Sequence, residues 1–398
     1  MRTVFVNAKV ITPYRLIAED GGIIAEEGKI IEVFEDGKLE KLPDDTVIDA
    51  EGLYLSPGFI DIHTHGAGNA DFMDGTVEAV CTACRTHMQY GTTSIVPTTL
   101  SSRQDEHYTN LKNIEKASKI NDNMPEILGI HVEGPYFSPE QNGAQDSKHI
   151  REIDPEEYKN ILEFCPFIIR WTVAPEVPGG LDMGRWLHEN GIVASIGHSN
   201  AVYEDVVRAC ENGYSTITHF FNGMSRLIRK NALMYLGVAE SGLLLDDLIV
   251  EIIADGKHLP PSLLKLIYKA KGADRICLVT DSMRAAGLDV NESIIGSLTN
   301  GQRVEIEDGV AYMPGRRSFG GSICTADRLI RTMVELADVP LVEAVKMLTL
   351  VPAKVLKVDN RKGSLMAGKD ADIILFDEDI NIKLVMVKGN VRVNKLWR

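Results

Sequence analysis

Eight short apolar runs, separated by longer amphipathic segments, constrain the fold of this chain more than any other feature. The runs lie at residues 59–62, 94–96, 127–130, 168–173, 192–196, 216–218, 249–253 and 276–279. Between them, segments such as 203–211 and 261–271 have the apolar spacing of helices. Strand-helix alternation repeated eight times predicts an α/β fold of the (β/α)8 TIM-like barrel type. Periodicity alone also allows an open, doubly wound sheet.

Both ends of the chain show a different pattern, with short strands separated by glycine turns. We expect the two ends to combine into one small β-sandwich beside the barrel. Two more helical segments, around 325–337 and 342–355, follow the last apolar run. The predicted organisation is a first part of the sandwich at 1–55, the barrel at 56–358 and the second part of the sandwich at 359–398.

Composition and charge argue against several classes of partner. The formal net charge is -15, so the chain would repel nucleic-acid phosphates, and we expect no nucleic-acid partner. No apolar run approaches the roughly 20 residues needed to span a bilayer, and the N-terminus has no secretory pattern. Six cysteines without a framework spacing fit a reducing compartment. We therefore predict a cytoplasmic protein without membrane association.

Cys81 and Cys84 form a Cys-x-x-Cys pair inside the helical-looking segment 77–90. Such a pair can carry redox or metal chemistry. The neighbouring apolar residues favour the simpler interpretation, in which both cysteines occupy buried helix positions.

Polar residues follow the apolar runs at the places where barrel enzymes carry their catalytic groups. The first run ends in His63-Thr64-His65, and alternate residues of a strand point the same way, so the two imidazoles can reach one point. After the other runs come Thr98, Thr99, His131, Glu133, Thr172, Glu176, His198, His219, Asp255, His258 and Asp281. Histidines and carboxylates gathered at strand ends predict a divalent-metal centre.

Each candidate has an alternative role when it is considered alone. His198 and His219 could be hydrogen-bonded core histidines, and Glu133 could lie at the surface between its strand and a Gly-Pro turn. Asp281 could cap a helix. Taken together, they favour histidine ligands, a bridging Glu133 and Asp281 as the acid/base that takes a proton from water and returns it to a leaving nitrogen.

Several runs, in order along nearly the whole chain, resemble the N-acetylglucosamine-6-phosphate deacetylase family of the metal-dependent amidohydrolase superfamily. They are Pro57-Gly58-Phe59-Ile60-Asp61-Ile62-His63-Thr64-His65-Gly66, His131-Val132-Glu133-Gly134-Pro135-Tyr136, Gly143-Ala144-Gln145, Gly197-His198-Ser199, Thr218-His219-Phe220-Phe221-Asn222-Gly223-Met224, Ala254-Asp255-Gly256-Lys257-His258, Leu278-Val279-Thr280-Asp281-Ser282-Met283 and Gly363-Ser364-Leu365-Met366-Ala367-Gly368-Lys369-Asp370-Ala371-Asp372. His-x-His occurs throughout the superfamily, whereas the Glu-Gly-Pro and Asp-Gly-x-His runs are more specific to the deacetylases.

The resemblance implies hydrolysis of the acetamido group of an amino-sugar phosphate, giving acetate and the free amine. It implies one or two divalent ions per subunit, held by His63, His65, Glu133, His198, His219 and Asp281, with Asp281 as the catalytic residue. Zinc, iron(II) and manganese all suit such ligands. It further implies substrate contacts from Ala144, Asn222, Gly223 and His258, a loop at Phe319-Gly320-Gly321 that closes over the substrate, and a homodimer.

One departure from the family pattern concerns the phosphate. Family members carry an Arg-Glu-Pro-Gly run whose arginine anchors phosphate, often across a dimer. Here ungapped counting places Lys230 at that position, with Arg229 beside it. Either cation can bind phosphate, although lysine does so without the planar fork of arginine; a solvated basic patch is the alternative. The galacto epimer, an unphosphorylated amide and a non-catalytic binding role therefore stay open as alternatives.

Overall fold

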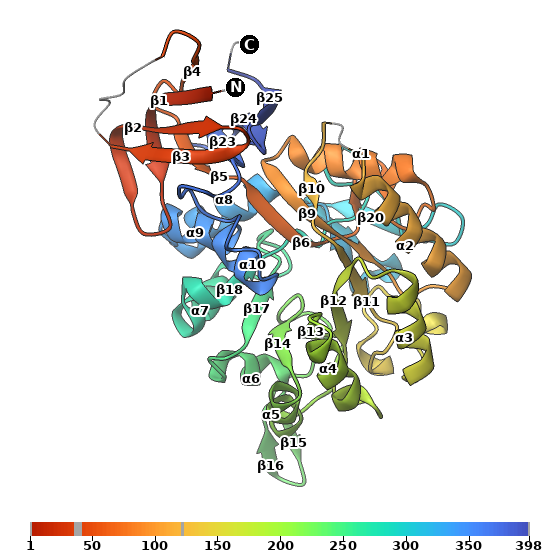
Figure 1. Ribbon diagram of the computed structural model, residues 1–398. Helices are drawn as coiled ribbons and strands as arrows, with labels where there is room; N and C mark the ends of the chain where they lie inside the picture. The colour runs from red at the N-terminus through yellow and green to blue at the C-terminus, as the bar shows by residue number, and fades with distance from the viewer. Residues whose placement is uncertain (1, 36–41, 121–122, 397–398) are drawn as a thin grey trace.

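The eight predicted runs form the parallel strands of a nearly closed barrel (Figure 1). The computed structural model of the protein describes residues 2–35, 42–120 and 123–396. The barrel strands are β6 (Phe59–Thr64), β9 (Thr92–Thr99), β11 (Ile130–Glu133), β12 (Ile168–Val173), β13 (Val193–Ile196), β14 (Tyr214–Ile217), β17 (Ile249–Ile252) and β18 (Ile276–Leu278), and the short β10 (Glu126–Ile127) also pairs with β9. The barrel prediction is confirmed.

Helices between and after the strands cover the outside of the barrel (Figure 1). They are α1 (Val77–Met88), α2 (Gln104–Ser118), α3 (Pro155–Phe164), α4 (Gly180–Glu189), α5 (Tyr203–Glu211), α6 (Val238–Leu244), α7 (Pro261–Lys271), α8 (Ala326–Ala337), α9 (Leu341–Met347) and α10 (Leu350–Val355). Cys81 and Cys84 lie on the buried face of α1, and burial raises the pKa of the Cys84 thiol. Their prediction as buried helix positions is confirmed. Among the described residues, no helix has the length and apolarity that crossing a membrane requires.

Individual hydrogen bonds, from side chains and from the backbone, join the barrel where its first and last strands meet. No backbone ladder links β6 to β18 among the described residues. Instead, Thr280 donates from Oγ1 to the buried carboxylate of Asp61 at 2.6 Å. The amide of Asp281 donates to the carbonyl of His63 at 2.8 Å. This seam places the carboxylate that follows β18 next to the histidines of β6.

Strands from both chain ends form a single antiparallel-rich sheet beside the barrel (Figure 1). Its order is β25 (Asn390–Asn394), β24 (Ile382–Val387), β23 (Ile373–Phe376), β5 (Tyr54–Pro57), β1 (Arg2–Ile11), β2 (Leu16–Glu26) and β3 (Lys29–Phe34), and β4 (Thr46–Asp49) also pairs with β1. The two ends thus combine as predicted, with all eight strands in one connected sheet. We propose the division at 1–55, 56–358 and 359–398; β5 continues the sheet to Pro57.

A four-stranded antiparallel sheet between β18 and α8 was not predicted from the sequence. It consists of β19 (Glu292–Ile295), β20 (Gln302–Glu307), β21 (Val310–Tyr312) and β22 (Phe319–Ser322). Phe319, Gly320 and Gly321, expected to form a loop, belong to β22, where backbone pairing with β21 orders them. The strands are short and half-exposed, so their apolar pattern is too weak to distinguish them from a loop.

A partly buried ionic cluster connects the terminal sheet to the barrel. Glu126 of β10 accepts from Lys362 at 2.7 Å, from Arg361 at 3.0 Å and from Lys388 at 3.0 Å. Burial alone would raise the pKa of Glu126, but the Lys362 charge and the three hydrogen bonds outweigh it and lower the pKa to about 2.

We expect Glu126→Gln to lower the free energy of unfolding by ~2 kcal/mol at pH 7. Because the carboxylate pKa is depressed in the folded state, its contribution is complete above about pH 4.5 and is lost as the pH falls towards 2. Denaturant unfolding of both proteins between pH 7 and pH 2 measures this. A constant difference across that range would contradict the interpretation.

Candidate active site

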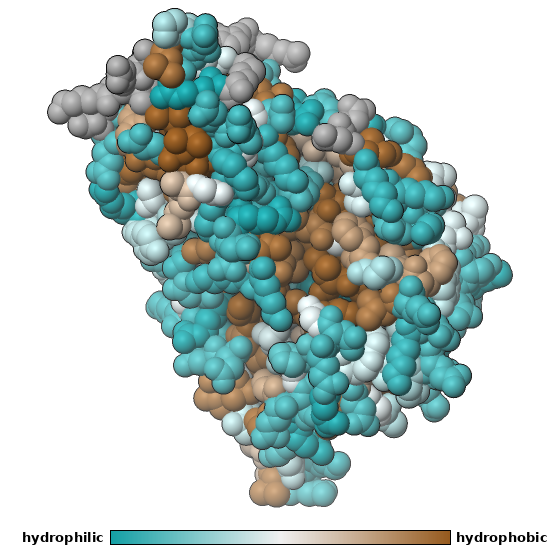
Figure 2. Space-filling view, viewed as in Figure 1, coloured by the Kyte–Doolittle hydropathy of each residue, from teal (hydrophilic) through white to brown (hydrophobic). Residues whose placement is uncertain are grey.

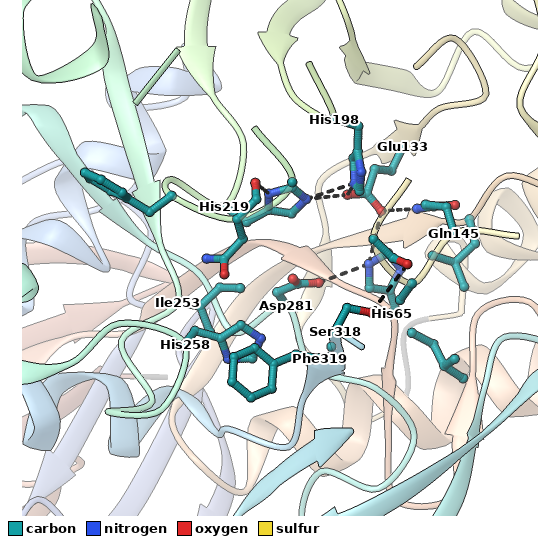
Figure 3. Close-up of a pocket in the computed structure, with 18 of the residues that line it drawn as sticks. His65, Glu133, Gln145, His198, His219, Ile253, His258, Asp281, Ser318 and Phe319 are labelled. Carbon is teal, nitrogen blue, oxygen red and sulfur yellow. Dashed lines mark hydrogen bonds and ion pairs between the residues drawn. The ribbon is translucent and has the colours of Figure 1, made fainter. Parts of the chain in front are cut away.

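The predicted metal-binding residues converge at the C-terminal end of the barrel strands, and Figure 3 labels all of them except His63. His63 lies in β6 and Glu133 ends β11, while the other members follow directly after strands; the set is His63, His65, Glu133, His198, His219 and Asp281, and all are buried. His198, His219 and Asp281 have backbone φ angles of 49°, 30° and 43°. Residues other than glycine rarely adopt this left-handed backbone region, and such conformations concentrate at functional sites.

Glu133 stands between two clusters of ligand atoms. Its Oε1 lies 3.3 Å from His198 Nε2 and 3.2 Å from His219 Nε2. On the other side, Glu133 Oε1 lies 3.5 Å from His63 Nε2, and Oε2 lies 3.4 Å from His65 Nε2. The residues therefore form two groups that could each hold an ion, and Glu133 belongs to both. This position suits the bridging role predicted for it.

Asp281 faces the group formed by His63 and His65. Its Oδ1 lies 3.1 Å from His65 Nε2 and 3.4 Å from His63 Nε2. Burial would raise the pKa of the Asp281 carboxyl, but the charge of His63 and the hydrogen bond from His65 hold it below its usual value. The carboxylate is therefore ionised at neutral pH and can accept a proton.

The imidazoles present their Nε2 atoms to the site in a form that fits a cation. His65, His198 and His219 each have Nδ1 within 3.2 Å of a backbone carbonyl, which can only accept, so each Nδ1 carries a hydrogen and each Nε2 is left to hold either a proton or a metal ion. The Nε2 atoms of His198 and His219 are 3.0 Å apart. Two lone pairs and a carboxylate at this separation repel one another unless a positive charge lies between them. The buried His63 Nε2 likewise has no hydrogen-bond partner among the described residues.

Charge around the histidines also marks the site as a cation-binding one. Burial would lower the pKa of His65, but its hydrogen bond to Asp281 and the charges of Glu133 and Asp281 raise the pKa to about 9. For Glu133, burial is outweighed by His63, His198 and His219, which hold the carboxyl pKa well below its usual value. A proton on an imidazole thus takes the place that a metal ion would fill.

A pocket of about 230 Å³ opens over these ligands. Its walls include five of the six metal-binding candidates and most of the predicted substrate contacts, namely Ala144, Asn222, Gly223, His258, Phe319 and Gly321. His63 lies behind the pocket surface and is fully buried. Gly320 points away from the pocket, because a Cβ there would meet the Val304 side chain at 2.6 Å; it serves packing within the four-stranded sheet.

A side chain at Gly223 would be strained for two reasons. Its φ is +55°, and a Cβ at this position would lie 3.2 Å from His198 Nδ1. His258 is fixed by Asp255, which accepts from Nδ1 at 2.8 Å, and its ring contacts that of Phe319 at 4.4 Å between centroids. The pocket floor therefore consists of metal-binding candidates and its walls of residues that can hold a small polar molecule.

The structure places Arg229 and Lys230 outside the pocket of their own chain. Both lie in β15 (Ile228–Lys230), which pairs with β16 (Leu233–Tyr235) in an exposed hairpin that projects from the barrel (Figure 1). Arg226 is instead the one lysine or arginine on the pocket wall, as far as the described residues show.

Sequence reasoning missed several residues at the site. Gln145 donates to Glu133 Oε2 at 2.7 Å and so helps to orient that carboxylate. Arg226 and Ser318 line the pocket, and Ile295 of β19 adds an apolar wall. Gln145 lies in the run Gly143-Ala144-Gln145, which resembles the deacetylase family, so the sequence contained a signal for it. The others come from segments without periodicity, so only their placement in space reveals them.

Comparisons with known proteins agree with this geometry. The sequence pattern of the amidohydrolase family matches residues 54–392. The chain is 34% identical over 347 residues to N-acetylglucosamine-6-phosphate deacetylase from Lysinibacillus sphaericus, an alignment that covers 87% of each protein.

Two solved structures have the same fold over nearly their full length. The crystal structure of N-acetylglucosamine-6-phosphate deacetylase from Pasteurella multocida superimposes with a TM-score of 0.90 at 30% identity, covering 99% of this chain and 100% of that one. A mutant of the deacetylase from Mycobacterium smegmatis, in complex with N-acetyl-D-glucosamine-6-phosphate, gives a TM-score of 0.89 at 26% identity, covering 99% and 100%. This chain therefore belongs to the amidohydrolase family, and within it to the N-acetylglucosamine-6-phosphate deacetylases.

Proposed function

We propose that this protein hydrolyses the acetamido group of N-acetylglucosamine 6-phosphate, giving glucosamine 6-phosphate and acetate in amino-sugar catabolism. The observation that carries the proposal is the pocket itself, in which three candidate ligand histidines, backed by His63, and two carboxylates meet walls able to hold a sugar. The deacetylase relatives and the substrate complex of the Mycobacterium smegmatis protein support the choice of substrate.

We propose that one or two divalent ions bind per subunit, at the two groups of ligands that share Glu133. The first comprises His63, His65 and Glu133, and the second comprises Glu133, His198 and His219. A bound divalent ion lowers the pKa of water towards neutrality and polarises a carbonyl oxygen. Zinc, iron(II) and manganese each accept this mixture of imidazole and carboxylate ligands.

Asp281 serves as the acid and base of the reaction. Its ionised Oδ1 accepts the proton of the attacking water and then delivers it to the sugar nitrogen, so that the amine leaves as a neutral group. Gln145 and the histidine hydrogen bonds keep Glu133 fixed while charge moves beside it. Because the ligand set is buried, bulk water is largely excluded from the proton-transfer path.

The pocket walls orient the sugar so that its acetamido group faces Asp281. His258, fixed by Asp255, and the side chain of Asn222 supply hydrogen bonds to sugar oxygens, as does the backbone at Gly223. Ala144 and Phe319 provide the apolar surface that a sugar ring contacts. Since Phe319 belongs to an ordered strand, any closure over the substrate involves the four-stranded sheet as a unit.

We propose that the protein acts as a homodimer and that the projecting hairpin lies at the subunit interface. The hairpin exposes Leu227, Ile228, Leu233 and Met234, and Figure 2 shows tan to brown atoms at its tip. Apolar side chains gathered on a projecting hairpin are typical of contact surfaces. Through this contact, Arg229 or Lys230 would reach the phosphate in the neighbouring subunit.

Acetate release from purified, metal-quantified protein tests the proposed function. The substrates are N-acetylglucosamine 6-phosphate, its galacto epimer and unphosphorylated N-acetylglucosamine. We expect kcat/KM to be highest for the gluco phosphate. A higher value for the epimer or for the unphosphorylated sugar would identify one of the alternative substrates. If none of these amides released acetate, the result would favour a non-catalytic binding role.

The phosphate anchor is tested with Arg229→Ala and Lys230→Ala. We expect at least one of them to lower kcat/KM for the phosphorylated sugar by about 10- to 100-fold, because a charge-assisted hydrogen bond to phosphate contributes about 1.5–3 kcal/mol. Activity on the unphosphorylated sugar should stay unchanged. Arg226→Ala is the matched variant for the cation on the pocket's own wall. If it alone removes the preference for phosphate, the anchor lies within one chain.

A further inference from the structure

One of the four ligand histidines differs from the others in what holds its ring. His65, His198 and His219 direct Nδ1 to backbone carbonyls of Thr98, Gln141 and Asn222, respectively. His63 instead directs Nδ1 to a carboxylate, with Glu251 Oε2 at 3.2 Å. A carboxylate partner makes an imidazole a stronger metal ligand than a carbonyl does, because it stabilises positive charge on the ring.

Glu251 lies in β17, inside the barrel and beneath the proposed metal centre. Its side chain is fully buried, and so is that of Arg170 from β12, with which it forms an ion pair. The Arg170 guanidinium also donates to Ser195 Oγ at 3.0 Å, to Thr218 Oγ1 at 3.1 Å and to the carbonyl of Ile62 at 3.3 Å. Arg170 therefore holds the Glu251 carboxylate in one place by bonds to neighbouring strands.

Stability alone is a weak reason for this ion pair. The interior of a (β/α)8 barrel is usually filled by aliphatic side chains. Removing two charges from water is costly, and well-packed apolar residues in their place are often as stable or more so. A charged pair at this depth is better explained by what Glu251 contacts, which is the histidine at the base of the site.

We propose that Glu251, held by Arg170, is a positioning residue that strengthens His63 as a metal ligand. The inference rests on the proposed metal centre but not on the identity of the substrate. Glu251 accepts the Nδ1 hydrogen of His63 and thereby directs the Nε2 lone pair at the space shared with Glu133 and Asp281. An ion held by His63 and His65 would depend on Glu251, whereas an ion held by His198 and His219 would not.

Titration of metal-free protein with Mn²⁺ tests the proposal without any substrate. For Glu251→Gln, we expect the dissociation constant of one ion to rise about 10- to 100-fold, which is typical for loss of such an outer partner, and the other to stay unchanged. The weakened ion should be the one missing from a His63→Asn variant. Electron paramagnetic resonance should detect magnetic coupling between two bound Mn²⁺ ions in the wild type. In Glu251→Gln this coupling should be lost.

Two further variants separate positioning from a general disturbance of the core. Ser195→Ala removes one bond to Arg170 but leaves its bonds to Thr218 and Ile62, so Glu251 should stay in place and Mn²⁺ binding should stay close to that of the wild type. If Glu251→Gln does not fold because Arg170 is left unpaired, Arg170→Met/Glu251→Met removes both charges and should show the same weakened ion. Wild-type Mn²⁺ affinities in a folded Glu251 variant, or equal weakening in Ser195→Ala, would overturn the proposal.

Discussion

Asp281→Asn is expected to lower kcat for amide hydrolysis by about 10³-fold, within the range that a positioned acid/base contributes. Asparagine keeps the shape of the side chain, but its amide cannot accept a proton from water at neutral pH. Nor can it return one to the departing nitrogen. KM should change little, because Asp281 lies at the metal-binding floor of the pocket and not on the sugar-binding walls.

Metal content and thermal unfolding provide the controls for Asp281→Asn. His63, His65, Glu133, His198 and His219 remain as ligands, so bound metal should stay close to the wild-type amount. An enzyme that holds its metal and turns over at nearly the wild-type rate would exclude Asp281 as the acid/base. Loss of both metal and activity would show that the main role of Asp281 is to bind the metal.

Removal of divalent ions with a chelator is expected to lower the rate of amide hydrolysis by about 10³-fold or more. Adding zinc, iron(II) or manganese should restore the rate. Without an ion, no remaining group in the pocket can acidify water or polarise the acetyl oxygen to a comparable extent. The chelated protein should stay folded, because the ligands lie on strand ends of a barrel with its own apolar core.

The affinity of the site for a divalent ion should increase as the pH rises. In metal-free protein the pKa of His65 is raised to about 9, so the ring carries a proton at pH 7 that an entering ion displaces. Affinity should therefore rise by up to tenfold per pH unit and level off above about pH 9. Calorimetric titration between pH 6 and pH 9.5 measures this. Affinity that is independent of pH, or full activity after complete chelation, would contradict the metal centre.

The barrel could be predicted because its signal is local and repeated. Each strand is a short apolar run and each helix an amphipathic segment, so segments such as 203–211 and 261–271 coincide with α5 and α7. The four-stranded sheet at 292–322 has no such signal. Its strands are short, half-exposed and interrupted by turns, and backbone pairing with neighbours decides their structure.

For the site, strand-end positions in the sequence were enough to predict the histidines and carboxylates at the centre. Parallel strands of a barrel end at one face, so histidines and carboxylates placed just after them must converge. The residues that support them could not be predicted, because these partners come from strands far apart in the chain. The tertiary structure brought Gln145 to Glu133, and Glu251 with Arg170 beneath His63. It also carried Arg229 and Lys230 away from their own pocket on a projecting hairpin, since contacts across space have no fixed spacing along a sequence.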